Sequence, residues 1–96
     1  MLFDVSRSNP QPLPAQIAAS VRAAIASGVL APGDELPSTR AAAQQAGVSR
    51  GTVVAAYDQL AGEGYLLLAQ GAPTRVHPQL RVAAAAAGVG GGGGPA

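Results

Sequence analysis

The sequence contains no cysteine and no lysine, and it has only one phenylalanine, two tyrosines and no tryptophan. Without cysteine the chain forms no disulfide and offers no thiolate ligand to a metal. Without lysine it has no amine for a Schiff base with pyridoxal phosphate, so that chemistry is excluded from these 96 residues. Its single histidine and its five scattered carboxylates do not converge on an acid–base or metal site. We therefore expect neither an enzyme nor a metal-binding protein.

The sequence also lacks a hydrophobic run long enough to span a bilayer. Its first residues have neither the charged region nor the apolar region of a secretory signal. These absences predict a soluble, cytoplasmic protein. The scarcity of aromatic residues further predicts a core built from small aliphatic side chains.

Composition divides the chain into three parts. Residues 1–11 are mostly polar and end in a proline-rich run, so we expect a flexible N-terminal arm. Its small apolar cluster, Leu2, Phe3 and Val5, leaves packing against the domain open as the alternative. Residues 12–78 carry nearly all the large apolar side chains and form one foldable domain of marginal size. Residues 79–96 are rich in alanine and glycine and have little to bury, which predicts a disordered linker or tail.

The apolar spacing predicts three helices in the domain. The first runs over about residues 14–27, with its apolar stripe at Leu13, Ile17, Val21, Ala24 and Ile25. Gln16, Ser20 and Arg22 lie off that stripe. The second runs over residues 39–46 and has Ser38 as its N-terminal cap.

The third helix, over about residues 50–63, is the element around which the others are organised. Gly47 can adopt the left-handed conformation that ends the preceding helix, and Ser49 can cap the new one. Its core-facing stripe is Val53, Ala56, Tyr57 and Leu60. The front turn is polar and is left free for a partner, as in a helix-turn-helix.

After the third helix, residues 65–77 read as a strand, a turn at Gln70-Gly71-Ala72-Pro73, and a second strand. Glu35-Leu36 is compatible with a very short strand before the second helix. Three helices followed by a hairpin predict a mainly α fold of the winged helix-turn-helix type, with the hairpin as the wing.

Arginine supplies all six basic residues, although the net charge is only +1. Arg40, Arg50 and Arg75 lie where a DNA-facing surface needs them, and the guanidinium fork suits phosphate oxygens and guanine edges. Alternatives stay open: Arg50 can pair with Asp58, and Arg75 can sit in water. The remaining arginines, Arg7, Arg22 and Arg81, are equally consistent with codon bias.

With these residues laid out, the chain resembles the DNA-binding domain of a GntR-family transcription regulator. The matching segments are Pro32 to Arg40, Gly47 to Val53, Tyr57 to Leu60 and Gly62 to Leu66, which occur in the order of the family. Leu-Pro-Ser-Thr-Arg and Thr-Val-Val-Ala-Ala-Tyr-Asp-Gln-Leu are most similar to the MocR-type branch. The resemblance implies a linker and an aminotransferase-like domain beyond this chain, where pyridoxal phosphate would bind.

The resemblance also implies a set of DNA-contacting positions in the second helix, the front of the third helix and the wing. They are Ser38, Thr39, Arg40, Ser49, Arg50, Gly51, Thr52, Gln70, Gly71 and Arg75. Two departures from the family pattern stand out. Ala69, preceded by Leu67 and Leu68, replaces the polar residue often found before the Gln-Gly of the wing. Gly51 replaces a polar side chain and permits close approach of the backbone.

The function expected from these features is sequence-specific binding of double-stranded DNA, with residues 50–63 in the major groove and no catalysis in this chain. Three phosphate-neutralising arginines predict a salt slope of roughly −3 and hence weak binding by one copy. Tight binding then needs a dimerising domain that is not present here. The alternative function is a winged-helix module that binds another protein and not DNA.

Overall fold

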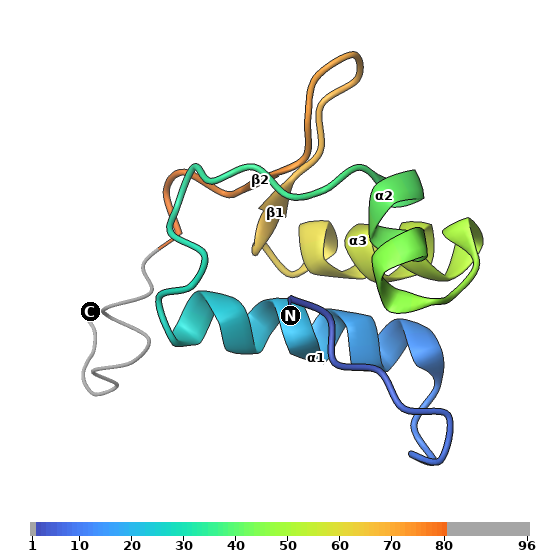
Figure 1. Cartoon of the computed structure of the whole chain (residues 1–96). Coiled ribbons are helices and arrows are strands. Elements are labelled where there is room, and N and C mark those ends of the chain that lie inside the picture. The colour runs from blue at the N-terminus through green and yellow to red at the C-terminus, as the bar shows by residue number, and fades with distance from the viewer. Residues whose placement is uncertain (1, 81–96) are drawn as a thin grey trace.

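The computed structural model describes residues 2–80, which fold into three helices followed by a short hairpin. The elements are α1 (Leu13–Ala26), α2 (Thr39–Ala46), α3 (Arg50–Gly62), β1 (Leu66–Leu67) and β2 (Arg75–Val76). α3 is the central element, since it packs against α1, α2 and β1 (Figure 1). The predicted helices and the winged helix-turn-helix architecture are confirmed. Met1 and residues 81–96, with most of the predicted linker, lie outside the described residues.

The core lies between α1, the underside of α3 and the hairpin. All four residues of the predicted α3 stripe, Val53, Ala56, Tyr57 and Leu60, are buried. The α1 stripe faces them with Ile17, Val21, Ala24 and Ile25, and the strands add Leu66 and Val76. Most of these side chains are small and aliphatic, as the shortage of aromatic residues predicted.

The hairpin is shorter than the predicted range of residues 65–77. Its strands are antiparallel, and only Leu66 with Val76 and Leu67 with Arg75 are in register. The loop that follows Leu67 contains Gly71, at φ +76°, and Pro73, which has no N–H to donate to a ladder. The loop projects away from the helices (Figure 1).

A third backbone segment pairs with the outgoing strand of the hairpin. Glu35 forms an isolated antiparallel bridge with Arg75, at the position whose sequence is compatible with a very short strand. Leu36 N donates to Thr74 O at 2.8 Å, and Val76 N donates to Asp34 O at 2.8 Å. Residues 34–36, which lead directly into α2, are therefore attached to the wing through backbone hydrogen bonds.

The N-terminal segment differs from the flexible arm that we expected over residues 1–11. Phe3 is only 3% exposed and belongs to the core, and Leu2 and Val5 pack against it. Burial of one phenylalanine side chain contributes about 1.5–3 kcal/mol, which offsets much of the cost of ordering a short segment. The segment runs along α1 and does not extend from the domain (Figure 1).

Gln16 holds this segment in place. The sequence places Gln16 off the apolar stripe of α1, but in the structure its side chain is buried and makes three hydrogen bonds. Oε1 accepts from Ser6 N at 2.7 Å, and Nε2 donates to the carbonyl oxygens of Ser6 and Gln11 at 3.0 and 2.9 Å. The amide is buried by the N-terminal segment and keeps its hydrogen bonds, so its burial carries little penalty.

Candidate nucleic-acid interface

The junction between α2 and α3 has the two caps that the sequence predicted. Gly47 adopts the left-handed conformation, with φ 70° and ψ 36°, and ends α2. Ser38 Oγ accepts from Ala41 N at 3.1 Å, and Ser49 Oγ accepts from Thr52 N at 3.1 Å. Each cap satisfies one backbone donor of its helix and fixes the direction in which the helix begins.

The first turns of α2 and α3 are joined by side chains. Arg50 Nε donates to Thr39 Oγ1 at 3.0 Å, and the hydroxyl groups of Ser49 and Thr52 lie 2.9 Å apart. Five of the predicted DNA-contacting residues therefore form one group at the helix starts, with Ser38 next to Thr39 in the chain. The contact orients the Arg50 guanidinium across the two helices and leaves its terminal nitrogens without a partner in the described residues.

The positive charge of this group is not neutralised. In residues 2–80 the ion pairs are Arg22 with Glu63 and Arg75 with Glu35, so neither Arg40 nor Arg50 has a carboxylate partner. Both are exposed. The pairing of Arg50 with Asp58, considered above, does not occur. The backbone N–H groups at the start of α3 add partial positive charge, and together these groups favour an anion.

The wing lies across a shallow groove from α3. This groove has a volume of about 300 Å³ and is lined by Thr39, Val54, Tyr57, Asp58, Leu68, Ala69, Gln70 and Thr74. Gln70 is thus brought near the first turn of α2, whereas Gly71 lies in the exposed loop that follows. The wing and the helix starts therefore border one continuous surface.

Arg75 has a different environment from Arg40 and Arg50. One terminal nitrogen donates to Gly33 O at 3.0 Å, and the other pairs with Glu35 Oε2 at 3.1 Å. The guanidinium thus folds back on the loop before α2, and the Glu35 carboxylate neutralises it. Its proposed phosphate contact remains a prediction, now in competition with an internal partner.

Tyr57 anchors the site from below and packs in the core, as predicted. Its hydroxyl donates to Pro37 O at 2.9 Å, one residue before the cap of α2. Burial raises the pKa of Tyr57 from 10.0 to about 12, because the ionised phenolate would lose its hydration. The hydrogen bond fixes the entry to α2 relative to α3.

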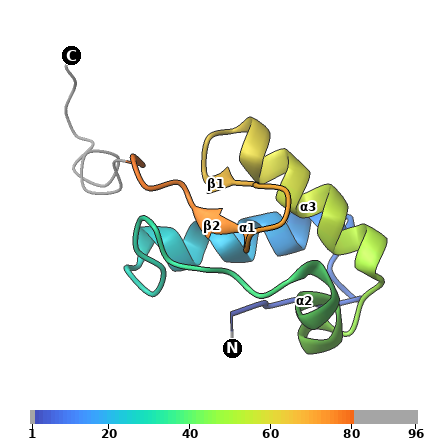
Figure 2. The same ribbon diagram turned by 90° about the horizontal axis from the view of Figure 1, so that it is seen from above.

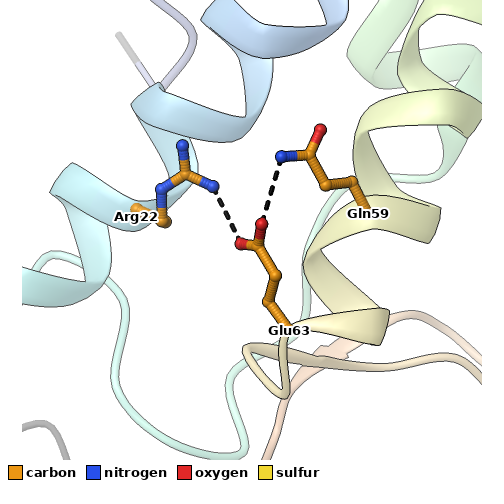
Figure 3. Close-up of polar contacts among 3 residues, drawn as sticks. All are labelled: Arg22, Gln59 and Glu63. Atoms are coloured by element: carbon orange, nitrogen blue, oxygen red, sulfur yellow. Dashed lines mark hydrogen bonds and ion pairs between the residues drawn. The ribbon is translucent and has the colours of Figure 1, made fainter.

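Two arginines, for which the sequence alone suggested no role, have structural partners. Arg7 donates to Gly47 O at 2.9 Å, so the N-terminal segment reaches the junction of α2 and α3. Arg22 on α1 pairs with Glu63 at the end of α3 at 2.9 Å, and Gln59 donates to the same carboxylate at 3.1 Å (Figure 3). The apolar cluster near Arg7, above all Phe3, is the feature of the sequence that allowed packing of this segment on the domain as the alternative to a flexible arm.

The groups that this surface exposes are suited to binding an anion. Within residues 2–80, no three His, Asp or Glu side chains come together in a way that could hold a metal ion. No helix in this range has the length and apolarity needed to cross a membrane. The chemical resources of the site are guanidinium groups, hydroxyl groups and backbone N–H donors on an exposed surface.

Comparison with known proteins finds that this chain is similar to bacterial regulatory proteins. Residues 13–76 match the family described as "Bacterial regulatory proteins, gntR family". The HTH-type pyridoxine biosynthesis transcriptional regulator PdxR of Corynebacterium glutamicum is 52% identical over 73 residues, which make up 76% of this chain and 16% of that protein. The probable rhizopine catabolism regulatory protein MocR of Rhizobium meliloti is 40% identical over 72 residues, 75% of this chain and 15% of that protein. The chain thus spans about a sixth of these relatives.

Solved structures resemble the whole domain. YtrA from Sulfolobus acidocaldarius, a GntR-family transcription factor, superimposes with a TM-score of 0.76 and 34% identity, covering 83% of this chain and 84% of that one. AraR(DBD) in complex with operator ORX1 superimposes with a TM-score of 0.67 and 32% identity, covering 75% and 86%.

Proposed function

This chain belongs to the gntR family of bacterial regulatory proteins and forms a winged-helix DNA-binding domain of that family; from this premise we propose how it engages its operator. α3 enters the major groove with its first turn, and the wing contacts the flanking backbone. The observation that carries the proposal is the position of Arg50. It lies at the capped, exposed start of α3, is oriented by Thr39 and has no carboxylate partner among residues 2–80.

Arg50 is proposed to read a guanine through O6 and N7, because the guanidinium fork matches that pair of acceptors. The other residues of the helix starts, Ser38, Thr39, Arg40, Ser49 and Thr52, are proposed to contact phosphates and to set the register of the domain. These contacts need a short distance between α3 and the duplex.

Gly51 supports such a close approach. A Cβ atom at this position would meet nothing nearer than Ser49 Oγ at 3.9 Å, so the fold itself does not require glycine there. The absence of a side chain instead leaves the backbone of the first turn open to the duplex. Gln70 and Gly71 are proposed to touch the backbone from the wing, without deep insertion into the minor groove, because exposed Leu67 and Leu68 precede them.

We infer that the domain is the DNA-binding part of a longer MocR-type regulator. The inference is supported by the identity to PdxR and by the small share of that protein that the chain spans. Dimerisation, and with it two half-sites about one helical turn apart, is assigned to the remainder of such a protein. The present chain has no lysine and does not fit pyridoxal phosphate, so that cofactor is assigned to the remainder as well. A regulator of this kind acts on DNA in the cytoplasm.

Selection from a random duplex library, followed by titration of the selected duplex, tests the proposal. Arg50→Ala should reduce affinity for the selected duplex about 5- to 150-fold, the range expected for a lost bidentate contact. Arg22→Ala is the matched control, because it also removes an arginine but from the contact between α1 and α3. Equal affinity of wild type and Arg50→Ala would overturn the proposal.

The salt dependence gives a second readout. Because Glu35 already neutralises Arg75, the residues among 2–80 that we propose to neutralise phosphates are Arg40 and Arg50, and the expected slope of log K against log salt is roughly −2 per domain. The 96-residue chain should therefore bind weakly at physiological salt. Nanomolar binding by a demonstrated monomer would contradict the assignment of tight binding to a dimer.

A further inference from the structure

The outer surface of α3 includes two exposed apolar residues one helical turn after Arg50. Val54 lies four residues beyond Arg50, one helical turn along the same face, and its side chain is 38% exposed. Ala55, next to it, is also exposed. Residues on this face are available to whatever approaches the start of α3.

Val54 also borders the groove between α3 and the wing. Leu68, 41% exposed, and Ala69 form the apolar part of the opposite side. The positive groups at the helix starts adjoin this surface, because Thr39 lines the same groove and holds Arg50 by a hydrogen bond. Asp58, one helical turn beyond Val54, lines the same groove and bounds the apolar strip on the side away from Arg50. The strip and the Arg50 guanidinium beside it suit a partner that is anionic overall and offers one apolar group.

Double-stranded DNA meets this requirement in one way. Base edges in the major groove carry hydrogen-bonding groups, and their apolar group is the C5-methyl of thymine. We propose that Val54 reads a thymine methyl and so specifies a T·A pair in the operator half-site. The proposal rests on the proposed function, since it requires α3 to occupy the major groove.

The helix geometry places this base pair. Four residues along an α-helix advance about 6 Å, and successive bases on one strand are about 3.4 Å apart along the duplex. The thymine should therefore lie about two base pairs from the guanine that Arg50 reads. This spacing is a property of the operator that can be checked without knowing its sequence beforehand.

Replacement of thymine by deoxyuridine tests the proposal, because it removes the methyl group and keeps the base pair. In the duplex selected from a random library, each thymine is replaced in turn, and affinity for the 96-residue chain is measured by fluorescence anisotropy at low salt. The guanine that Arg50 reads is identified first, as the base whose substitution removes the effect of Arg50→Ala. At one thymine about two base pairs from this guanine, loss of the methyl group should lower affinity about three- to fivefold.

Val54→Ala should lose this sensitivity, so that the thymine and deoxyuridine duplexes bind equally. Val54 is exposed and alanine favours helix, so the variant should fold, which circular dichroism checks. Val29→Ala is the matched control, because Val29 is 70% exposed in the turn after α1 and should retain the full sensitivity to the methyl group.

The possible failures are distinguishable. If no duplex is selected, the proposed function fails and this inference fails with it. If a duplex is selected and Arg50→Ala weakens binding, but no thymine is sensitive to its methyl group, the assignment of Val54 alone is overturned. The same holds if the sensitivity persists in Val54→Ala.

Discussion

Each end of α3 has a charged side chain, Arg50 at its start and Glu63 directly after its last residue, and the two charges are used differently. At the C-terminal end, Glu63 is held by Arg22 at 2.9 Å and by Gln59 at 3.1 Å, which ties α3 to α1 (Figure 3). At the N-terminal end, the one side-chain partner of Arg50 among residues 2–80 is the Thr39 hydroxyl. One end therefore uses its charges to stabilise the fold, and the other keeps its charge for a ligand.

Arg75 is intermediate between these two cases. It lies on the wing, near the surface expected to face DNA, yet it is paired with Glu35 and with the carbonyl of Gly33. Residue type and position in the sequence do not tell whether Arg75 or Arg50 is neutralised. The two differ because Arg75 faces the Glu35 carboxylate across the backbone bridge.

Both ends of α3 depend on its buried underside, which holds the helix against the core. Leu60→Ala should lower the free energy of unfolding by about 2–5 kcal/mol, because Leu60 is fully buried and its removal leaves a cavity. Chemical denaturation checks this value. A loss below 1 kcal/mol would mean that the ends of α3, and not its core contacts, hold it in place.

Arg50→Lys tests whether Arg50, at the N-terminal end of α3, acts through its charge or through the planar shape of its guanidinium. Lysine keeps the positive charge but loses the planar fork, so discrimination of the guanine should fall by about 1–3 kcal/mol while the salt slope stays unchanged. Competition between the selected duplex and one with the guanine replaced gives this value. Retained discrimination would show that Arg50 acts as a point charge.

Ser49→Ala tests whether the N-terminal end also contributes to stability through its caps. Loss of the hydrogen bond from Thr52 N to Ser49 Oγ should destabilise the domain by about 1 kcal/mol. Ser49→Asp, which can still cap, should restore stability, as thermal unfolding would show. It should also weaken DNA binding, because it places a negative charge beside the phosphates.

Tyr57→Phe tests the link between α3 and the entry to α2. Loss of the hydrogen bond to Pro37 O should cost about 0.5–1.5 kcal/mol at neutral pH. Because the pKa of Tyr57 is raised from 10.0 to about 12 in the folded state, its contribution is complete below pH 10 and is lost as the pH rises from 10 to 12. Urea unfolding across this range should show a smaller pH dependence for Tyr57→Phe than for the wild type.

Glu35→Gln should remove the ion pair of Arg75 and leave its guanidinium charge unneutralised. Removing the carboxylate makes a third guanidinium available, so the salt slope should steepen by about one and affinity at low salt should rise a few-fold. Exposed ion pairs contribute about 0.2–1 kcal/mol, so the loss of stability should be small. An unchanged slope would mean that Arg75 does not reach the duplex.

The sequence predicted the parts of the fold that depend on local chemistry. The caps at Ser38 and Ser49 and the left-handed Gly47 follow from residue type and position, and all are present. The buried stripe of α3 follows from helical spacing in the same way. These features need no knowledge of distant parts of the chain.

What the sequence did not predict depends on contacts between distant residues. Phe3 is buried and Gln16 bonds Ser6 because the N-terminal segment turns back along α1; the apolar cluster of the segment allows this packing, but no local pattern predicts the path. The carboxylate partners of Arg22 and Arg75 lie 41 and 40 residues away in the sequence. Whether an arginine is free or paired is therefore a property of the tertiary structure.

The backbone pairing of residues 34–36 with residues 74–76 has a consequence for how the domain meets a duplex (Figure 2). The segment that leads into α2 and the strand that returns from the wing are joined by main-chain hydrogen bonds, which mutation of side chains does not remove. The two contact regions should thus move as one rigid unit, with a fixed separation. Because the distance between the two contact regions is fixed, we expect the domain to favour DNA sequences whose groove width already matches that distance.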